Sequence, residues 1–477
     1  MKHIGLKKIA VSSLWLTSSF VITKISQLIA QIFLARLLTP KDFGIWGMVL
    51  IITTLSGLFK DTTIATVLVQ RGLDDKKLVD TVYSLGVNIS IILFVIQMLS
   101  GFPLAYFFNE PLMLPLVAAT ALVFLISAGT GSHSAIIQQQ MKFKELAISD
   151  SLAGLARFAG AVICAAYGLG VWSFVVAEIT MAIVDTLLKR WFSKYHFKYY
   201  LIPDKSVVQE VGTYISSLIG INLAVYFNTT SDNIIIAKLL GAQALGYYNL
   251  AYLLAMLPVF ALSQINHVNF SVLSQRDNEG KKLYLSQVLE TYAIVYALIY
   301  GVAFVIAPWI IPFLYGLEWV PVVQLFRIIL IFSYARGFMS ILGTALITVN
   351  KPGVNAAINW VLIPISFLAY FVGAKLGGSS GVAIAVALVM GVFASAWFWY
   401  ATCRATGWSI GVLIKPIFLP TTVIVGIILA LQLETLPVYL QTIIATFGYG
   451  IALSILSAGR IPRIFINGYK KFIHAEN

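Results

Sequence analysis

Apolar residues run through this sequence in long stretches, and short segments between them hold most of the charged residues. A helix that crosses a membrane needs about 20 mostly apolar residues, and fourteen stretches meet that length. We therefore predict an all-α, polytopic membrane protein with about fourteen transmembrane helices. The predicted spans centre on residues 11–35, 44–69, 80–101, 112–133, 147–168, 170–190, 207–230, 244–270, 284–310, 320–347, 354–374, 380–401, 415–433 and 437–457.

The composition excludes a soluble protein. Hydrophobic residues make up 59% of the 477 residues and charged residues only 11%, with a mean hydropathy of +0.90. Soluble proteins carry about 25% charged residues, so a globular enzyme, a disordered chain and a disulfide scaffold are excluded. Because the segments between the spans are short, there is no room for a separate catalytic domain, and we expect no enzyme activity.

Basic residues lie mainly on one side of the predicted membrane. With the N-terminus in the cytoplasm, 23 of the 32 Lys and Arg residues fall in cytoplasmic ends and loops, four in outer loops and five inside spans. Cytoplasmic loops carry an excess of Lys and Arg, so we predict that both termini are cytoplasmic and that the number of spans is even. The same excess explains most of the net charge of +13 without nucleic acid as a partner.

The longest basic connection, residues 189–205, follows the sixth span and is rich in aromatic residues. This composition predicts a helix on the membrane surface and a boundary between two halves. We predict an N-lobe of spans 1–6 over residues 1–200 and a C-lobe of spans 7–12 over residues 201–405. Spans 13 and 14 occupy residues 406–477 with a basic amphipathic tail, which we expect on the anionic inner leaflet.

An internal repeat supports this division. Residues 35–52 align with residues 237–254 at a constant offset of 202, and both segments join an odd-numbered span to the next through an outer loop. The identical pairs are Ala35 and Ala237, Leu37 and Leu239, Leu38 and Leu240, and Gly44 and Gly246. A parallel repeat of six helices, related by an axis along the membrane normal, is typical of some transporters. It predicts two lobes around a central cavity that opens to either side in turn.

Five basic residues lie inside predicted spans, although a charge at the centre of a span costs roughly 2.5–3.5 kcal/mol. They are Lys24, Lys60, Arg157, Arg327 and Arg336. A water-filled cavity would remove most of this cost, and an anionic ligand would give a reason to keep the charges. We therefore predict that these residues bind an anionic substrate.

Uncharged polar residues extend this predicted site. Residues spaced by three or four positions share one face of a helix, and two such faces correspond to each other under the offset of 202. They consist of Lys24, Gln27 and Gln31 in the first span and of Tyr226, Thr229 and Asn233 in the seventh. The polar run at residues 228–233 predicts that the seventh span bends or partly unwinds there.

Structural roles compete with substrate binding at several of these positions. Arg327 is near a span end, where it can snorkel to the interface. Lys60 can pair with its neighbour Asp61, and Arg157 can pair with Glu178 in the sixth span. The acids inside spans are alternative sites for a coupling Na⁺ or proton: Asp61, Glu178 and Asp232. The sequence contains no metal-ligand spacing and no nucleotide-binding motif, so we expect no cofactor and no direct use of ATP.

The segment ARLLTPKDFGIWGMVLIITTL at residues 35–55, with VLVQR at 67–71, resembles the N-terminal signature of the bacterial polysaccharide-synthesis flippases. In that family a helix ends in L-A-R-x-L-x-P-x-[DE]-[FY]-G, and a segment similar to L-V-Q-R closes the next helix. The segment IIQQQMKFKELAISD at residues 136–150 is similar to the family's connection into span 5, although Gln140 stands where a basic residue is usual.

The resemblance implies a member of the multidrug/oligosaccharidyl-lipid/polysaccharide exporter superfamily, similar to the flippases of O-antigen, capsule and exopolysaccharide repeat units. Such proteins carry polyprenyl-diphosphate-linked oligosaccharides from the inner to the outer leaflet of the bacterial cytoplasmic membrane by alternating access. Their anionic diphosphate suits Lys and Arg side chains. Besides membrane lipids, the partners implied are a polysaccharide polymerase and the chain-length machinery of lipopolysaccharide or exopolysaccharide assembly.

Three other functions compete with this one. A drug exporter of the same superfamily would favour acidic residues in the cavity, whereas cations outnumber acids here. A flippase of the lipid-linked peptidoglycan precursor shares the architecture and the charge. A membrane polysaccharide polymerase or ligase needs a large charged outer loop, and the predicted outer loops are short and nearly uncharged.

Overall fold

The computed structural model describes residues 6–61, 68, 75–263, 266–432 and 436–457. Helices make up 89% of the structure, and the described residues form no strand. Nine helices in this part of the chain are long and apolar enough to cross a membrane, or ten if one bent pair of helices forms a single span. The predicted all-α membrane fold is confirmed, whereas the number of fourteen spans stays a prediction.

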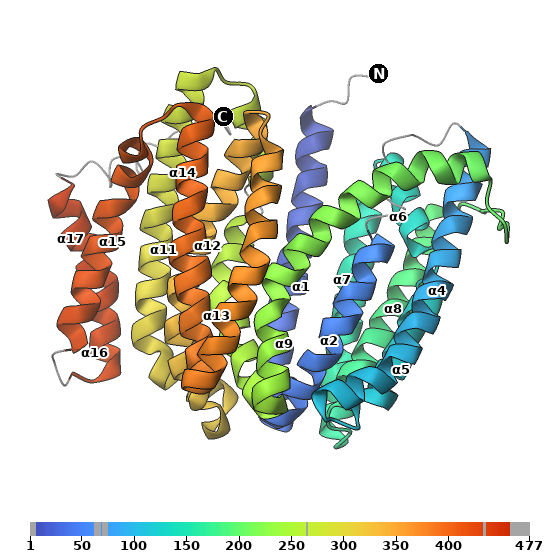
Figure 1. Ribbon diagram of the computed structural model, residues 1–477, viewed down its shortest axis with the longest axis horizontal. Helices are drawn as coiled ribbons and strands as arrows, with labels where there is room; N and C mark the ends of the chain where they lie inside the picture. The colour runs from blue at the N-terminus through green and yellow to red at the C-terminus, as the bar shows by residue number, and fades with distance from the viewer. Residues whose placement is uncertain (1–5, 62–67, 69–74, 264–265, 433–435, 458–477) are drawn as a thin grey trace. The chain divides into compact units, whose positions relative to one another are not determined.

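The chain forms two compact units, Met1–Asn249 and Leu250–Asn477. The helices of the first unit are α1 (Leu6–Leu37), α2 (Pro40–Asp61), α4 (Lys76–Phe108), α5 (Met113–Ile126), α6 (Thr130–Gln139), α7 (Phe143–Ala166), α8 (Trp172–Ser193) and most of α9 (Lys205–Ser263). Here α1 packs on α7, α7 on α8 and α4 on α5 (Figure 1). Because the unit boundary reflects compactness and lies inside α9, the lobes at residues 1–200 and 201–405 stay a prediction.

The helix α9 remains regular through residues 228–233, so the predicted bend there is wrong. It breaks instead at Gly241, whose φ of +84° lies in the region that glycine adopts without steric cost. The polar side chains of the run do not compete for the helical backbone. The Thr229 hydroxyl, for example, bonds to the Val225 carbonyl oxygen at 2.9 Å, an arrangement that a helix accommodates.

The helices α2 and α9 cross at two glycines that are equivalent in the internal repeat. A Cβ atom on Gly44 would overlap the carbonyl oxygen of Ala242, and a Cβ atom on Gly246 would overlap the carbonyl oxygen of Pro40. The contact is reciprocal, because Pro40 and Ala242 are also related by the offset of 202. The two backbones therefore touch directly, which requires a residue without a side chain at both crossing positions.

Residues 194–204 form a non-helical strap along α4, so the predicted surface helix is wrong in this part of the connection. Three polar residues of α4, spaced by four positions on one helix face, hold the strap. They are Asp80, which accepts from the N–H of Lys198 at 3.0 Å; Ser84, which accepts from the N–H of Tyr200 at 2.9 Å; and Asn88, which donates to the carbonyl of Leu201 at 3.1 Å. The strap's backbone thus finds partners without forming a helix.

The second unit begins within α9 and continues with a further set of helices. They are α10 (Asn266–Ser274), α11 (Asn278–Tyr315), α12 (Pro321–Thr348), α13 (Pro352–Val386), a π-helical segment (Ala387–Ala394), α14 (Ser395–Thr406), α15 (Ile410–Gln432), α16 (Val438–Ile443), a second π-helical segment (Ile444–Gly448) and α17 (Tyr449–Leu456). The long α13 is interrupted at Gly377 and Gly378, which leave the helical conformation.

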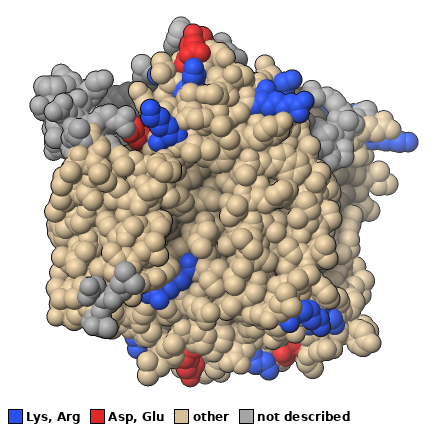
Figure 2. All heavy atoms as spheres, turned by 60° about the vertical axis from the view of Figure 1, so that its left-hand side comes forward, with Lys and Arg blue, Asp and Glu red and all other residues tan. Residues whose placement is uncertain are grey.

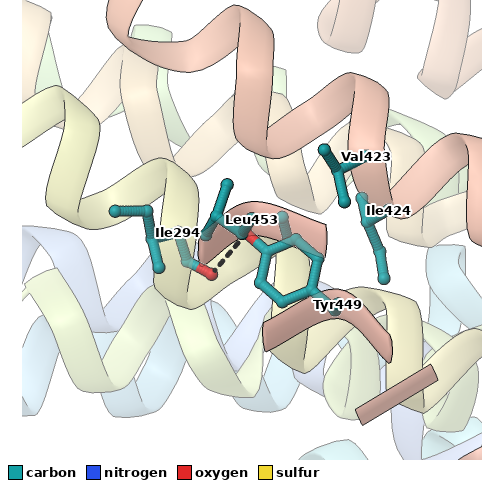
Figure 3. Close-up of a cluster of buried hydrophobic side chains, with 6 residues drawn as sticks. Ile294, Val423, Ile424, Tyr449 and Leu453 are labelled. Atoms are coloured by element: carbon teal, nitrogen blue, oxygen red, sulfur yellow. Dashed lines mark hydrogen bonds between the residues drawn. The ribbon is translucent and has the colours of Figure 1, made fainter. Parts of the chain in front are cut away.

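A buried cluster joins α15 and α17 to α11 (Figure 3). Val423 and Ile424 of α15 pack beside Leu453 of α17 and Ile294 of α11. The Tyr449 hydroxyl donates a hydrogen bond to the Ile294 carbonyl oxygen at 3.2 Å. The last two predicted spans therefore belong to the core of the second unit, although they lie outside the internal repeat.

The surface carries the charge pattern of a membrane protein. On the face drawn in Figure 2, charged side chains gather mainly toward the top and the bottom, and the broad region between them is almost entirely uncharged. Many large apolar side chains are exposed, among them Ile331, Leu368 and Phe418. Apolar exposure on this scale indicates contact with a membrane or a partner, and the long apolar helices identify it as the membrane.

Candidate functional site

Lys24 and Arg157 lie close together in the first unit, where α1 packs on α7. The helices approach closely at Gly154, where an added Cβ atom would lie only 3.2 Å from the Cγ2 atom of Thr23. One residue further along α1, the half-buried Lys24 is within electrostatic reach of Arg157. Its ammonium group donates to the side-chain oxygen of Gln27 at 3.1 Å. Two predicted substrate-binding cations are thus brought together.

Arg157 also forms an ion pair with Glu178 of α8. The pairing that the sequence offered as a structural alternative is therefore present, and it engages one of the three acids considered for a coupling ion. Lys24, Arg157 and Glu178 together, named here the Lys24 cluster, carry two positive charges and one negative charge. The cluster has a net positive charge inside apolar helices, which favours an anionic ligand.

Lys60 lies at the end of α2 and contacts the end of α5. Its ammonium group donates to the Ser127 hydroxyl and lies 5.8 Å from the centre of the Phe124 ring. A cation near a helix C-terminus is favourable because the last carbonyl groups carry partial negative charge. The alternative pair of Lys60 with Asp61 is not tested, because the Asp61 side chain lies outside the described part of the chain.

The polar face predicted on the seventh span takes part in helix packing. Tyr226 is buried, and its hydroxyl donates to the Ile51 carbonyl oxygen of α2 at 2.6 Å. Thr229 is exposed, with its hydroxyl bonded to the backbone of its own helix at 2.9 Å. Asn233 is half-buried, as is its repeat equivalent Gln31 on α1. The Tyr226 hydroxyl in particular is already hydrogen-bonded to a neighbouring helix.

Asp232 is buried and held across the break in α9. Its Oδ2 atom accepts a hydrogen bond from the Tyr248 hydroxyl at 2.7 Å, and its Oδ1 atom accepts from the backbone N–H of Asn233 at 2.8 Å. Only 4% of Asp232 and 0% of Tyr248 is exposed to solvent. Within the described residues, Asp232 forms no ion pair with Lys or Arg.

Arg327 and Arg336 lie on α12 in the second unit, and their surroundings differ. Pro308 in α11 has no N–H, so the carbonyl of Phe304 four residues earlier has no helical donor. The Arg327 Nε atom donates to this carbonyl at 2.9 Å, and the guanidinium lies 4.6 Å from the Phe304 ring. Arg327 therefore completes the hydrogen bonding of α11, while its position relative to the membrane interface stays a prediction. Arg336 is half-buried and makes no hydrogen bond or ion pair within the described chain.

Sequence reasoning missed Ser127 and Tyr248 as partners of site residues. Tyr248 is 16 positions beyond Asp232, and the two meet only because α9 reverses direction at Gly241. The glycine was the available signal, but a reversal does not indicate which side chains will pair. The part of the chain that the structure describes holds no group of three or more His, Cys, Asp and Glu residues suited to a metal ion.

A protein-family model described as "Polysaccharide biosynthesis protein" matches residues 33–324. The chain belongs to this family. Among its relatives is the lipopolysaccharide biosynthesis protein WzxC of Escherichia coli K12, 23% identical over 368 residues, which span 76% of this chain and 74% of the relative. The teichuronic acid biosynthesis protein TuaB of Bacillus subtilis 168 is 21% identical over 354 residues, 72% of each chain.

Solved structures show that this polysaccharide biosynthesis protein has a known transporter fold. The lipid II flippase MurJ, in an inward closed conformation, aligns with a TM-score of 0.77 over 94% of this chain and 100% of its own, at 14% identity. An inward-facing multidrug resistance MATE transporter of the MOP superfamily aligns with a TM-score of 0.60 over 81% of this chain and 95% of its own, at 15% identity. The predicted polysaccharide-synthesis family is confirmed, whereas membership of the superfamily stays a prediction.

Proposed function

We propose that this polysaccharide biosynthesis protein is a flippase of the cytoplasmic membrane. It moves polyprenyl-diphosphate-linked oligosaccharide repeat units from the inner to the outer leaflet for the assembly of O-antigen, capsule or exopolysaccharide. Family membership supports the proposal, as do relatives named for lipopolysaccharide and teichuronic acid biosynthesis. The fold shared with a structure titled lipid II flippase supports a transporter rather than an enzyme.

The observation that carries this proposal is the Lys24 cluster. It places two cationic side chains, Lys24 and Arg157, close together among three apolar helices, α1, α7 and α8. A diphosphate presents several acceptor oxygens, so it can accept hydrogen bonds from Lys24 and from Arg157 together. Lys60 extends this set to α2 in the same unit. Arg336 of the second unit, which has no partner within the described residues, is a further candidate for contact with the substrate.

We propose that the cycle uses alternating access driven by a proton or Na⁺ gradient, with both termini in the cytoplasm. The substrate's sugar crosses through water while its polyprenyl chain stays in lipid. No nucleotide-binding motif occurs in the sequence, so the proposal includes no direct use of ATP. A polysaccharide polymerase and the chain-length machinery are the expected downstream partners.

Lipid analysis of a strain that lacks the protein tests the function. We expect an unpolymerised, diphosphate-linked repeat unit to accumulate on the cytoplasmic side. If single units reach the outer leaflet and stop there, the protein acts after translocation, as a polymerase would. Accumulation of the peptidoglycan precursor would assign it to cell-wall synthesis, and unchanged lipid-linked sugars would favour a drug exporter.

Complementation of that strain tests the binding site. Lys24→Ala should reduce export at least about tenfold, because a charge-assisted contact to a diphosphate contributes about 1.5–3 kcal/mol, whereas Lys24→Arg should retain most of it. Lys144→Ala is the matched control, since Lys144 lies 5.5 Å from the Trp15 ring on the same two helices, α7 and α1. Membrane abundance is measured by immunoblot for each variant. Equal export by Lys24→Ala and Lys144→Ala would remove the Lys24 cluster from the proposal.

A further inference from the structure

Asp232 differs from the other two acids that the sequence offered for ion coupling. Glu178 is paired with Arg157, and the side chain of Asp61 lies outside the described part of the chain. Asp232 is buried at 4% exposure in a stretch apolar enough to cross a membrane, residues 222–263. Both of its oxygens accept hydrogen bonds from neutral donors, the Tyr248 hydroxyl and the Asn233 N–H.

Burial of Asp232 favours its neutral form, while the two hydrogen bonds that it accepts favour the ionised form, so a change in either can load or release a proton. An ionised carboxylate buried in a membrane helix is costly unless a cation pairs with it, and none does so within the described residues. The titratable group in contact with Asp232 is Tyr248, whose hydroxyl donates to it; Tyr226, six positions earlier on the same arm, donates its hydroxyl to the Ile51 carbonyl oxygen instead. The next cation along the helix, Lys238, is exposed and donates to the Phe107 carbonyl oxygen at 2.6 Å.

The position of Asp232 links its environment to the shape of α9. Asp232 lies on the arm before Gly241 and Tyr248 on the arm after it, so their hydrogen bond spans the reversal. The second arm also carries Gly246, which touches the backbone of α2. Movement of this arm away from the first would break the hydrogen bond and admit water to the carboxyl group. Water stabilises the ionised form and accepts the proton.

We propose that Asp232, clamped by Tyr248, is a proton-binding site separate from the Lys24 cluster, and that it carries the coupling proton of the transport cycle. The role of this proton in transport rests on the proposed function, whereas the binding of a proton to Asp232 does not. The neutral acid is the buried state; it releases its proton to water when the arms separate and takes one up before they close. A metal cation would need several oxygen ligands, and the described residues hold no group of three or more His, Cys, Asp and Glu side chains that could supply them.

Infrared spectroscopy of the purified protein in lipid vesicles tests the occupancy without substrate. A protonated carboxyl group has a carbonyl stretch well separated from that of a carboxylate. We expect a band in the wild-type protein at mildly acidic pH that Asp232→Asn lacks and that Tyr248→Phe shifts to higher frequency, because one hydrogen bond is lost. Asp185→Asn is the matched control, since Asp185 is paired with Lys189 at 2.8 Å and should contribute no such band.

Two results would overturn the proposal. Identical carboxylic-acid spectra for the wild type and Asp232→Asn across the neutral and mildly acidic range would mean that Asp232 is ionised. Loss of the band on adding NaCl at constant pH would mean that Na⁺ replaces the proton. In vesicles that flip the lipid-linked substrate, Asp232→Asn should abolish acceleration by a pH gradient while Asp185→Asn keeps it. If the wild type flips no such lipid but shows the band, the proposed function fails and the proton site stands.

Discussion

Arg157 shows how one side chain in an apolar helix can serve packing and binding together. It pairs with Glu178 on α8 and acts on Lys24 on α1, so three helices depend on one guanidinium group. The pair lowers the cost of keeping Arg157 inside the membrane, and it also holds the guanidinium near the ammonium group of Lys24. For this reason an alanine at Arg157 tests stability as well as transport.

A double-mutant cycle separates these roles. Arg157→Ala should lower the free energy of unfolding by about 1–3 kcal/mol, because it leaves the Glu178 carboxylate partly buried without its cation. Adding Glu178→Gln should restore most of that loss without restoring export. Thermal unfolding in detergent gives the stabilities. If the double variant is no more stable than Arg157→Ala, the two side chains are not coupled.

The two arginines of α12 offer a comparison on a single helix. Arg327→Ala should destabilise the protein by about 1–3 kcal/mol, because the Phe304 carbonyl beside Pro308 loses its only charged donor. Arg336→Ala should change the thermal midpoint little, since Arg336 has no partner within the described chain, but it should reduce export. Equal thermal midpoints for both variants would contradict the structural role of Arg327.

Side-chain partners could be predicted from the sequence only where a simple charge rule applied. The Arg157 and Glu178 pair was among the alternatives, because oppositely charged residues in consecutive spans tend to form ion pairs. The contacts of Lys60 with Ser127 and of Asp232 with Tyr248 were not predicted, because residues with a hydroxyl group are common in the chain and carry no charge that would point to a partner. Their pairing depends on the rotation of each helix about its axis, which apolar length does not determine.

At the scale of elements, apolar length predicts where helices lie, while local hydrogen bonding decides how they are connected. The connection at residues 189–205 has the composition of a surface helix, yet its residues 194–204 follow α4. Asp80 and Ser84 on that helix supply its hydrogen bonds from more than 100 positions away. Likewise, the seventh span breaks at Gly241 rather than in its polar run, because the polar side chains there find partners without opening the helix.

The strap should therefore detach from α4 when the side chains that accept its backbone hydrogen bonds are removed. Combined Asp80→Ala and Ser84→Ala substitutions are expected to make the bond after Lys198 cleavable by trypsin, since two backbone N–H groups lose their acceptors and the backbone becomes free to enter the protease. Ser100→Ala, further along α4, is the control, because the Ser100 hydroxyl bonds to the Gln97 carbonyl oxygen of its own helix and to no strap residue in the described chain. Full protection of the double variant would show that the strap is held by other contacts.

The crossing of α2 and α9 should not tolerate a methyl group. Gly44→Ala is expected to cost about 1–3 kcal/mol or to force the helices apart, because the clash is with a backbone carbonyl that no rotamer change relieves. Gly57→Ala on the same helix is the matched control, since an added Cβ atom there meets nothing within 4 Å. Thermal unfolding compares the two. A Gly44→Ala variant as stable as Gly57→Ala would contradict the close backbone contact.

For the molecule as a whole, the distribution of basic residues makes a topological prediction. An outer loop is expected near Lys375, just before the break of α13 at Gly377, and the C-terminus is expected in the cytoplasm. Alkaline phosphatase, which folds actively only outside, should be active when fused after Lys375 and inactive after Asn477; a cytoplasmic fluorescent reporter should give the opposite pattern. The same reporter activity at both positions would contradict the predicted placement of Lys375 and the C-terminus on opposite sides of the membrane.

The reciprocal contact of Gly44 and Gly246 also bears on how such a chain originates. Gly44 lies against the backbone of Ala242, and Gly246 lies against the backbone of Pro40, the repeat equivalent of Ala242. An interface between two identical subunits related by a two-fold axis has the same reciprocal arrangement. A half-length ancestor with this glycine would have dimerised through one self-complementary patch. Any substitution at this glycine would have changed both subunits at the same time. Fusion of two such genes would free the copies to diverge, and in this chain proline at position 40 has alanine at position 242 as its repeat equivalent.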